Sequence, residues 1–181
     1  MFLDALLAFV PVGSPLSLVL GAGVSAASNV LDMTGAGVGV APPNIIGTRT
    51  LFGVDPGIDD QKTQLQCTVG TAFTTSNSAT LNVQFQGAVD TGASGGYLPG
   101  TWITLVETGT IAAANLTAAA VIARFDWPPA FPAKTLPRFF RLNFVVPSAT
   151  NFTAGTIAFA YPVIARDDWA LAQAARNFSV A

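Results

Sequence analysis

The chain has 181 residues, of which 51% are hydrophobic and only 10% are charged, and its formal net charge is −2. This length is enough for one domain that folds without disulfides or metals, but the charged fraction is well under half of the ~25% typical of soluble domains. The eight basic residues form no dense run, which argues against nucleic acid as a partner, and the large uncharged surface favours a subunit of an assembly.

An apolar segment opens the chain. Residues 2–10 are almost entirely apolar, yet no basic residue precedes Arg49, so the charged start of a signal peptide is missing. Early prolines and glycines also break the run far short of the ~20 residues that a membrane span needs, so no membrane partner is expected. We predict an N-terminal arm over residues 1–24, which must find an apolar groove on its own subunit or on a neighbour. The expected interface residues of this arm are Phe2, Leu6 and Phe9.

The clearest strand signal lies at residues 78–86. Ala79, Leu81, Val83 and Phe85 alternate there with amides and hydroxyls, which predicts a strand with one buried face and one wet face in the middle of a sandwich. Apolar runs between turn residues predict further strands over residues 48–54, 62–70, 101–107, 119–125, 138–146 and 155–165. The expected core residues are Leu81, Val83, Phe85, Ile103, Leu105, Phe140, Leu142, Phe144, Ile157 and Phe159.

This strand rhythm predicts an all-β fold. Short strands separated by Gly, Ser, Pro and Asn turns are typical of sandwiches and barrels. We expect an antiparallel jelly-roll β-sandwich of about eight strands over residues 25–166. Two long connections interrupt it, a glycine-rich one at 87–100 and one with four prolines at 126–137. Because long loops often carry contacts, Tyr97 and Trp127 are candidate interface residues.

The pattern changes after Arg166. An acidic start, an alanine-rich body and Arg176 near the end predict a short C-terminal helix with a tail over residues 167–181. So short a helix is marginal in isolation, so we expect Trp169 to dock it on another surface.

Catalytic chemistry finds little support. The absence of histidine excludes His-dependent catalysis and metal binding, and the single cysteine, Cys67, is expected to be a buried, inert thiol. The aspartates at 55, 59 and 60 depart from the calcium-loop spacing, and the glycines at 35–39 lack the residues that complete a phosphate loop. Glu107 is expected to end a strand and serve the turn that follows it, and not to act in acid–base catalysis. We therefore expect no catalytic residue, no cofactor, no metal and no enzymatic activity.

The second half of the chain resembles the jelly-roll capsid cement, or decoration, proteins of tailed bacteriophages, of the Bordetella-phage type. The resemblance covers roughly residues 62–166. Residues that carry it lie at 78–86, 105–109, 111, 116–117, 136–144 and 152–155, including Leu136, Pro137 and Arg138 before Arg141, Leu142 and Asn143. The first 60 residues match only loosely, the two long loops look longer than in the family, and the C-terminal helix looks like an addition.

The resemblance implies a non-enzymatic protein that oligomerises on the outer surface of the virion's capsid and bridges major capsid subunits. Such a protein is made in the cytoplasm of the bacterial host. A homotrimer is more expected than a homodimer, because an apolar arm and low charge leave a monomer with too much uncovered surface. Arg138 and Arg141 are expected to meet carboxylates of the capsid.

One alternative stays open at this point. A carbohydrate- or receptor-binding β-sandwich of a virion or secreted protein would use Tyr97, Trp102 and Trp127 as stacking platforms. Clustered exposed aromatic residues on one face would favour this alternative, whereas an apolar contact face would favour the capsid protein.

Overall fold

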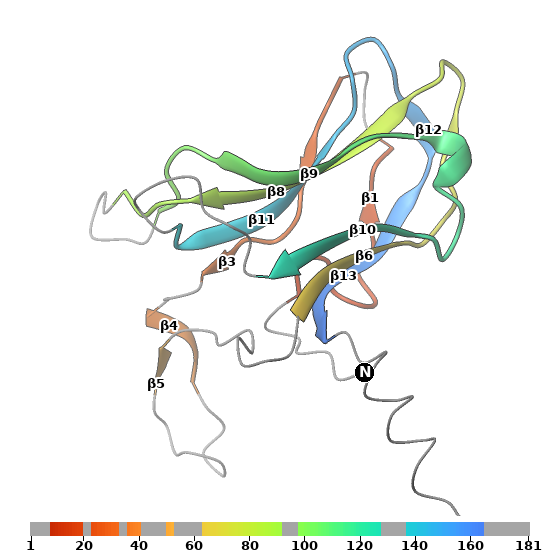
Figure 1. Ribbon diagram of the computed structural model, residues 1–181. Helices are drawn as coiled ribbons and strands as arrows, with labels where there is room; N and C mark the ends of the chain where they lie inside the picture. Colours follow the sequence, from red (N-terminus) through yellow and green to blue (C-terminus); the bar gives the residue numbers. More distant parts are fainter. Residues whose placement is uncertain are drawn as a thin grey trace, which may run out of the picture.

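Two antiparallel sheets packed face to face make up most of the computed structural model (Figure 1). The structure describes residues 8–19, 23–32, 36–40, 50–52, 63–91, 98–127 and 137–164. Phe2, Leu6, Tyr97, Trp169 and the helix expected at 167–181 lie outside these residues, as does the side chain of Trp127. No helix in the described ranges is long and apolar enough to cross a membrane.

The four-stranded sheet has the order β1-β13-β6-β10, and the five-stranded sheet has the order β2-β11-β8-β9 with β3 also paired to β11. The first consists of β1 (Leu16–Ser17), β13 (Thr156–Ile164), β6 (Thr63–Val69) and β10 (Val121–Trp127). The second consists of β2 (Ala26–Ala27), β3 (Leu31–Asp32), β11 (Phe139–Val145), β8 (Thr80–Ala88) and β9 (Ile103–Ala112).

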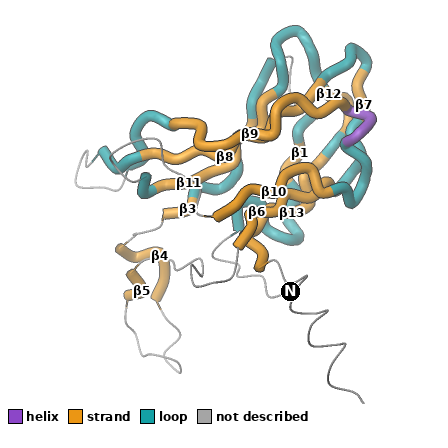
Figure 2. Tube along the Cα trace, in the orientation of Figure 1, coloured by secondary structure: helices purple, strands orange, loops and turns teal. Residues whose placement is uncertain are grey.

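Smaller elements complete the described part of the chain (Figure 2). Strand β12 (Phe152–Ala154) pairs with β7 (Thr74–Thr75), and β4 (Ala36–Val40) pairs with β5 (Thr50–Phe52). A single 3-10 turn follows β9 at Ala113–Asn115. The prediction of an all-β antiparallel sandwich is therefore confirmed.

The strand pairings are nested along the chain. Strand β1 pairs with β13, β2 with β11, β6 with β10 and β8 with β9, so the first principal strand meets the last and the middle two meet each other. As a result β1 and β2 are both outermost strands at one side of the sandwich. Strands β9 and β10 are the outermost strands at the other side.

Strand β8 is an inner strand of its sheet, as the alternation at 78–86 predicts. Leu81, Val83 and Phe85 are fully buried. The Phe85 ring stacks on Phe140 with centroids 5.6 Å apart and meets the edge of Phe9 at 5.9 Å. Phe85 is thus the centre of an aromatic cluster that joins both sheets and the N-terminal segment.

Three of the ten expected core residues are placed differently. Ile103 is 44% exposed, because β9 is an outermost strand and the residue opposite Ile103 is Gly87, which has no side chain to cover it. A register shift in β9 leaves Leu105 only partly buried against the core. A second shift between Ile157 and Phe159 in β13 brings Ala160 into the core and turns Phe159 to the outer face.

The described N-terminal segment packs on the sandwich from Ala8 onward, and the arm expected over residues 1–24 stays a prediction. The Phe9 ring is buried in the core, and Val10 forms a β-bridge with Ala160 of β13. Phe9 is therefore a core residue of its own subunit. The ring packs edge-on against Phe85 within the core cluster.

Candidate functional site

An apolar edge runs along the side of the sandwich where β1 and β2 lie. We give this name to the exposed residues Val12, Val19, Val24 and Val30 together with the groove between β1 and β2. These four side chains are 45–62% exposed. Among the described residues the other exposed large apolar side chains are Leu98, Ile103 and Val121, and the last two begin β9 and β10 on the opposite side.

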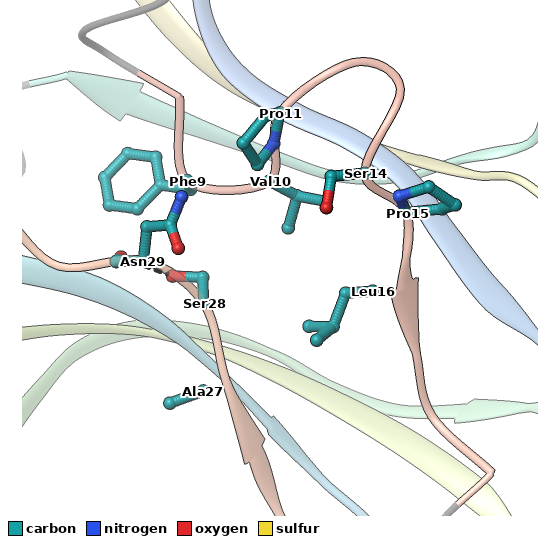
Figure 3. A pocket seen from close by; sticks show the side chains of 9 residues that line it. All are labelled: Phe9, Val10, Pro11, Ser14, Pro15, Leu16, Ala27, Ser28 and Asn29. Atoms are coloured by element: carbon teal, nitrogen blue, oxygen red, sulfur yellow. Dashed lines mark hydrogen bonds between the residues drawn. The ribbon is translucent and has the colours of Figure 1, made fainter.

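The groove has a volume of about 190 Å³ (Figure 3). Leu16 of β1 flanks it on one side and Ala27 of β2 on the other, with two prolines along the rim. Its other lining residues are Phe9, Val10, Pro11, Ser14, Pro15, Ser28 and Asn29.

Backbone hydrogen bonds fix the walls of the groove. The Asn29 N–H donates to the Phe9 carbonyl at 2.9 Å, and the Leu142 N–H donates to Ser28 Oγ at 2.8 Å. The Val12 N–H donates to the Tyr161 hydroxyl at 2.9 Å, which ties the outer turn to β13. The groove is therefore a preformed feature of the fold.

Both strands beside the groove offer backbone as well as side chains. Within the described residues β1 pairs only with β13, and β2 pairs only with β11. Each is two residues long. Exposed strand edges are templates for pairing with another chain, and here they lie beside exposed valines. The apolar edge thus combines two features that favour binding of another polypeptide.

A second surface of different chemistry covers the outside of the five-stranded sheet. We call it the amide face and define it by the outward side chains Asn82, Gln84, Gln86, Thr104, Glu107, Arg141 and Asn143. Gln84 is at its centre and connects three strands. Its Oε1 accepts from Gln86 at 3.1 Å and Asn143 at 3.2 Å, and its Nε2 donates to Glu107 at 3.1 Å.

The network continues at both ends of the amide face. Asn82 Nδ2 donates to Glu107 Oε2 at 2.9 Å, and these amide bonds lower the pKa of the Glu107 carboxyl. At the other end Arg141 Nε donates to Gln86 Oε1 at 2.9 Å. The Arg141 guanidinium lies 4.2 Å from the centre of the Trp102 ring. Partial burial lowers the pKa of Arg141.

Arg138 occupies a different environment from the one expected. Its Nε and Nη2 donate to the two carboxylate oxygens of Asp32 at 2.7 and 2.8 Å, and its Nη1 donates to Asp90 at 2.6 Å. The side chain is only 15% exposed. Arg138 therefore joins β3, β11 and the turn after β8 within one subunit. It is an internal ion-pair residue, and its contact with a capsid carboxylate stays a prediction.

Replacing Arg138 by alanine is expected to lower the free energy of unfolding by about 2 kcal/mol. Removing one partner of a fully buried pair costs about 3–5 kcal/mol, and the partial exposure of this cluster reduces that figure. Arg138→Lys should recover only part of the loss, because an ammonium cannot form the two-point contact with Asp32. Urea denaturation measures the loss, with the exposed Arg124→Ala as control. A loss below about 0.5 kcal/mol would contradict this role.

The candidate residues named from sequence are thus scattered. Phe9 is in the core, Arg138 is inside an ion-pair cluster, and Arg141 is on the amide face beside Trp102. The valines of the apolar edge were missed, because they are spread over residues 12–30 without the period of a strand or a helix. Their shared location depends on the pairing of β1 with β13 and of β2 with β11.

Features for catalysis are sparse in the part of the chain that the structure describes. No group of three His, Cys, Asp or Glu side chains there is placed to hold a metal ion. Cys67 is buried, as expected, and burial raises the pKa of its thiol far above the ordinary range. Glu107 lies within β9 and not at a turn, which corrects the expectation for it.

No protein-family model matches the chain, and no curated protein matches it.

Proposed function

We propose that the protein is a non-enzymatic capsid decoration protein of a tailed bacteriophage. It self-associates, with a homotrimer as the expected form, and binds the outer surface of the capsid, where it bridges major capsid subunits. Its site of synthesis is the cytoplasm of the bacterial host. The observation that carries the proposal is the apolar edge, because exposed valines, a preformed groove and strand edges that no described residue pairs lie together on one side of the sandwich.

The strand order supports the jelly-roll part of the proposal. A jelly roll has eight principal strands in two sheets. In sequence order its first strand pairs with its last, the second with the second-to-last, and so on to the middle two. The pairs β1 with β13, β2 with β11, β6 with β10 and β8 with β9 follow that scheme. The segments that resemble cement proteins include most of β8 and β11 and the centre of β9.

Adhesion at the apolar edge explains how such a protein would stabilise a shell. Apolar burial and backbone pairing across joints between capsid subunits add contacts that rupture has to break. A protein that binds the mature shell more tightly than other states shifts the equilibrium toward it. Because the valines are uncharged and Arg138 is engaged internally, this adhesion should survive high salt.

The test uses shells stripped of their decoration and the full-length protein. Sedimentation with the shells measures binding across a salt series, and heating measures the rupture temperature of the decorated shell. We expect binding that persists at 1 M salt, where the screening length falls to about 3 Å, and a higher rupture temperature at full occupancy. Loss of binding at moderate salt would contradict apolar adhesion, and an unchanged rupture temperature would contradict the decoration role.

Matched valine variants locate the contact. Val19→Asp and Val24→Asp place a charge on the apolar edge, and Val121→Asp places one at the start of β10 on the opposite side. We expect the first two to weaken shell binding or self-association by about tenfold or more, and the third to leave both unchanged. Analytical ultracentrifugation separates self-association from shell binding. Equal effects from all three variants would contradict the assignment of the apolar edge.

A further inference from the structure

The amide face keeps unused hydrogen-bonding groups after its internal network is complete. Within the described residues, no hydrogen bond uses the two Nη atoms of Arg141, the Oε1 of Glu107 or the Oδ1 of Asn143. Asn143 Nδ2 and Gln84 Nε2 each make one bond and carry a second N–H. Donors and acceptors are therefore intermixed over the outer side of three strands.

These groups are held in place by the bonds they already make. Gln84 is fixed from both sides by Gln86, Asn143 and Glu107, and Arg141 is fixed by Gln86 and by the Trp102 ring. A surface whose side chains are ordered before binding loses less conformational freedom when a ligand arrives. The network therefore presents a preorganised set of polar contacts.

The chemistry of the amide face indicates the kind of ligand. Protein interfaces have apolar or aromatic centres, whereas the centre here is Gln84 with amides and a carboxylate around it. Hydroxyl groups both donate and accept, so a polyhydroxylated chain matches intermixed amides well. The free guanidinium edge of Arg141 fits a carboxylate in a two-point contact. A saccharide that carries a carboxylate combines both features.

The distance between Arg141 and Glu107 further restricts which saccharides fit the amide face. Arg141 is opposite Gln86, and Glu107 is opposite Gln84, so the two charged residues are two strands and one two-residue step apart. This places them on the order of 12 Å from each other along a diagonal of the sheet. A carboxylate on every ring would bring one close to exposed Glu107. An alternation of acidic and neutral rings avoids that repulsion.

We propose that the amide face binds an oligosaccharide with alternating acidic and neutral rings. The carboxylate of one ring pairs with Arg141, and hydroxyl groups of the adjoining rings bond to Asn143, Gln84 and Thr104. This site is separate from the apolar edge and does not depend on the capsid role.

Titration calorimetry with defined tetrasaccharides tests the proposal on the full-length protein. A hyaluronan tetrasaccharide alternates glucuronate with N-acetylglucosamine, chitotetraose is neutral throughout, and tetragalacturonate is acidic throughout. We expect the hyaluronan fragment to bind about tenfold more tightly than either of the others, since chitotetraose lacks the carboxylate that pairs with Arg141 and tetragalacturonate brings a further carboxylate close to Glu107.

Arginine variants then assign the contact. Arg141→Gln should abolish the preference for the hyaluronan fragment. Arg141→Lys keeps the positive charge but cannot form the two-point contact with a carboxylate, so it should retain part of the preference. Arg124→Gln is the matched control, because Arg124 is an exposed arginine on β10 in the other sheet, and it should retain the full preference. Gln84→Ala should weaken hyaluronan and chitotetraose alike. Melting curves establish that each variant is folded.

Three results would overturn the proposal. Equal binding of the hyaluronan fragment and chitotetraose would show that the amide face does not recognise the carboxylate of the saccharide. If Arg124→Gln lost the preference for the hyaluronan fragment to the same extent as Arg141→Gln, the attraction between protein and saccharide would be non-specific. No saccharide binding by the parent protein, together with weaker shell binding in Arg141→Gln, would assign the guanidinium to a protein carboxylate instead.

Discussion

Replacing Phe85 by alanine is expected to lower the free energy of unfolding by about 3–5 kcal/mol, which for a marginally stable domain is a large fraction of the total. The ring is fully buried and contacts Phe140 of its own sheet, Phe125 of the opposite sheet and Phe9 of the N-terminal segment. No neighbour is free to fill the cavity, because each is held on a different strand or segment. Urea denaturation monitored by circular dichroism measures the loss.

Ile103→Ala is the informative control for Phe85→Ala. Both residues have the same sequence signature, an apolar position in an alternating strand, and both were predicted to be in the core. Ile103 is 44% exposed opposite Gly87, so its truncation should cost about 1 kcal/mol or less. Similar losses for the two variants would contradict the placement of β9 at the side of the sandwich.

The sequence predicted the strands that are long enough to show a period. Strand β8 has nine residues, with alternating burial from Thr80 to Phe85, and β6, β10, β11 and β13 have seven or more residues each. Strands β1 and β2 have two residues each, which is too short for any periodicity. The apolar edge depends on those short strands, and this is why it was not foreseen.

Register was a second limit of sequence reasoning. Period-two alternation places Ile157 and Phe159 on the same face, but the bulge between them reverses the faces for the rest of β13. Partners far apart in sequence were a third limit. Asp32 precedes Arg138 by 106 residues, and only the pairing of β3 with β11 shows that Arg138 is neutralised internally.

Glycine 155 illustrates a constraint that apolar patterning does not reveal. Gly155 has a φ of +143°, a conformation that residues with a side chain rarely adopt. A Cβ at this position would lie 2.3 Å from a Phe73 ring carbon. Phe73 cannot move away easily, because its ring packs edge-on against Phe152 at 4.8 Å and its N–H donates to the Leu116 carbonyl at 3.0 Å.

Gly155→Ala is therefore expected to lower the free energy of unfolding by about 3 kcal/mol or more, as the sum of backbone strain and overpacking against Phe73. Gly109→Ala separates the two terms, because Gly109 also has a positive φ, of +71°, but nothing lies within 4 Å of the added carbon. That variant should cost only about 1 kcal/mol from strain. Combining Gly155→Ala with Phe73→Ala should cost less than the sum of the single changes, since the clash is then absent. Equal losses for Gly155→Ala and Gly109→Ala, or strict additivity with Phe73→Ala, would mean that Phe73 does not pack on Gly155.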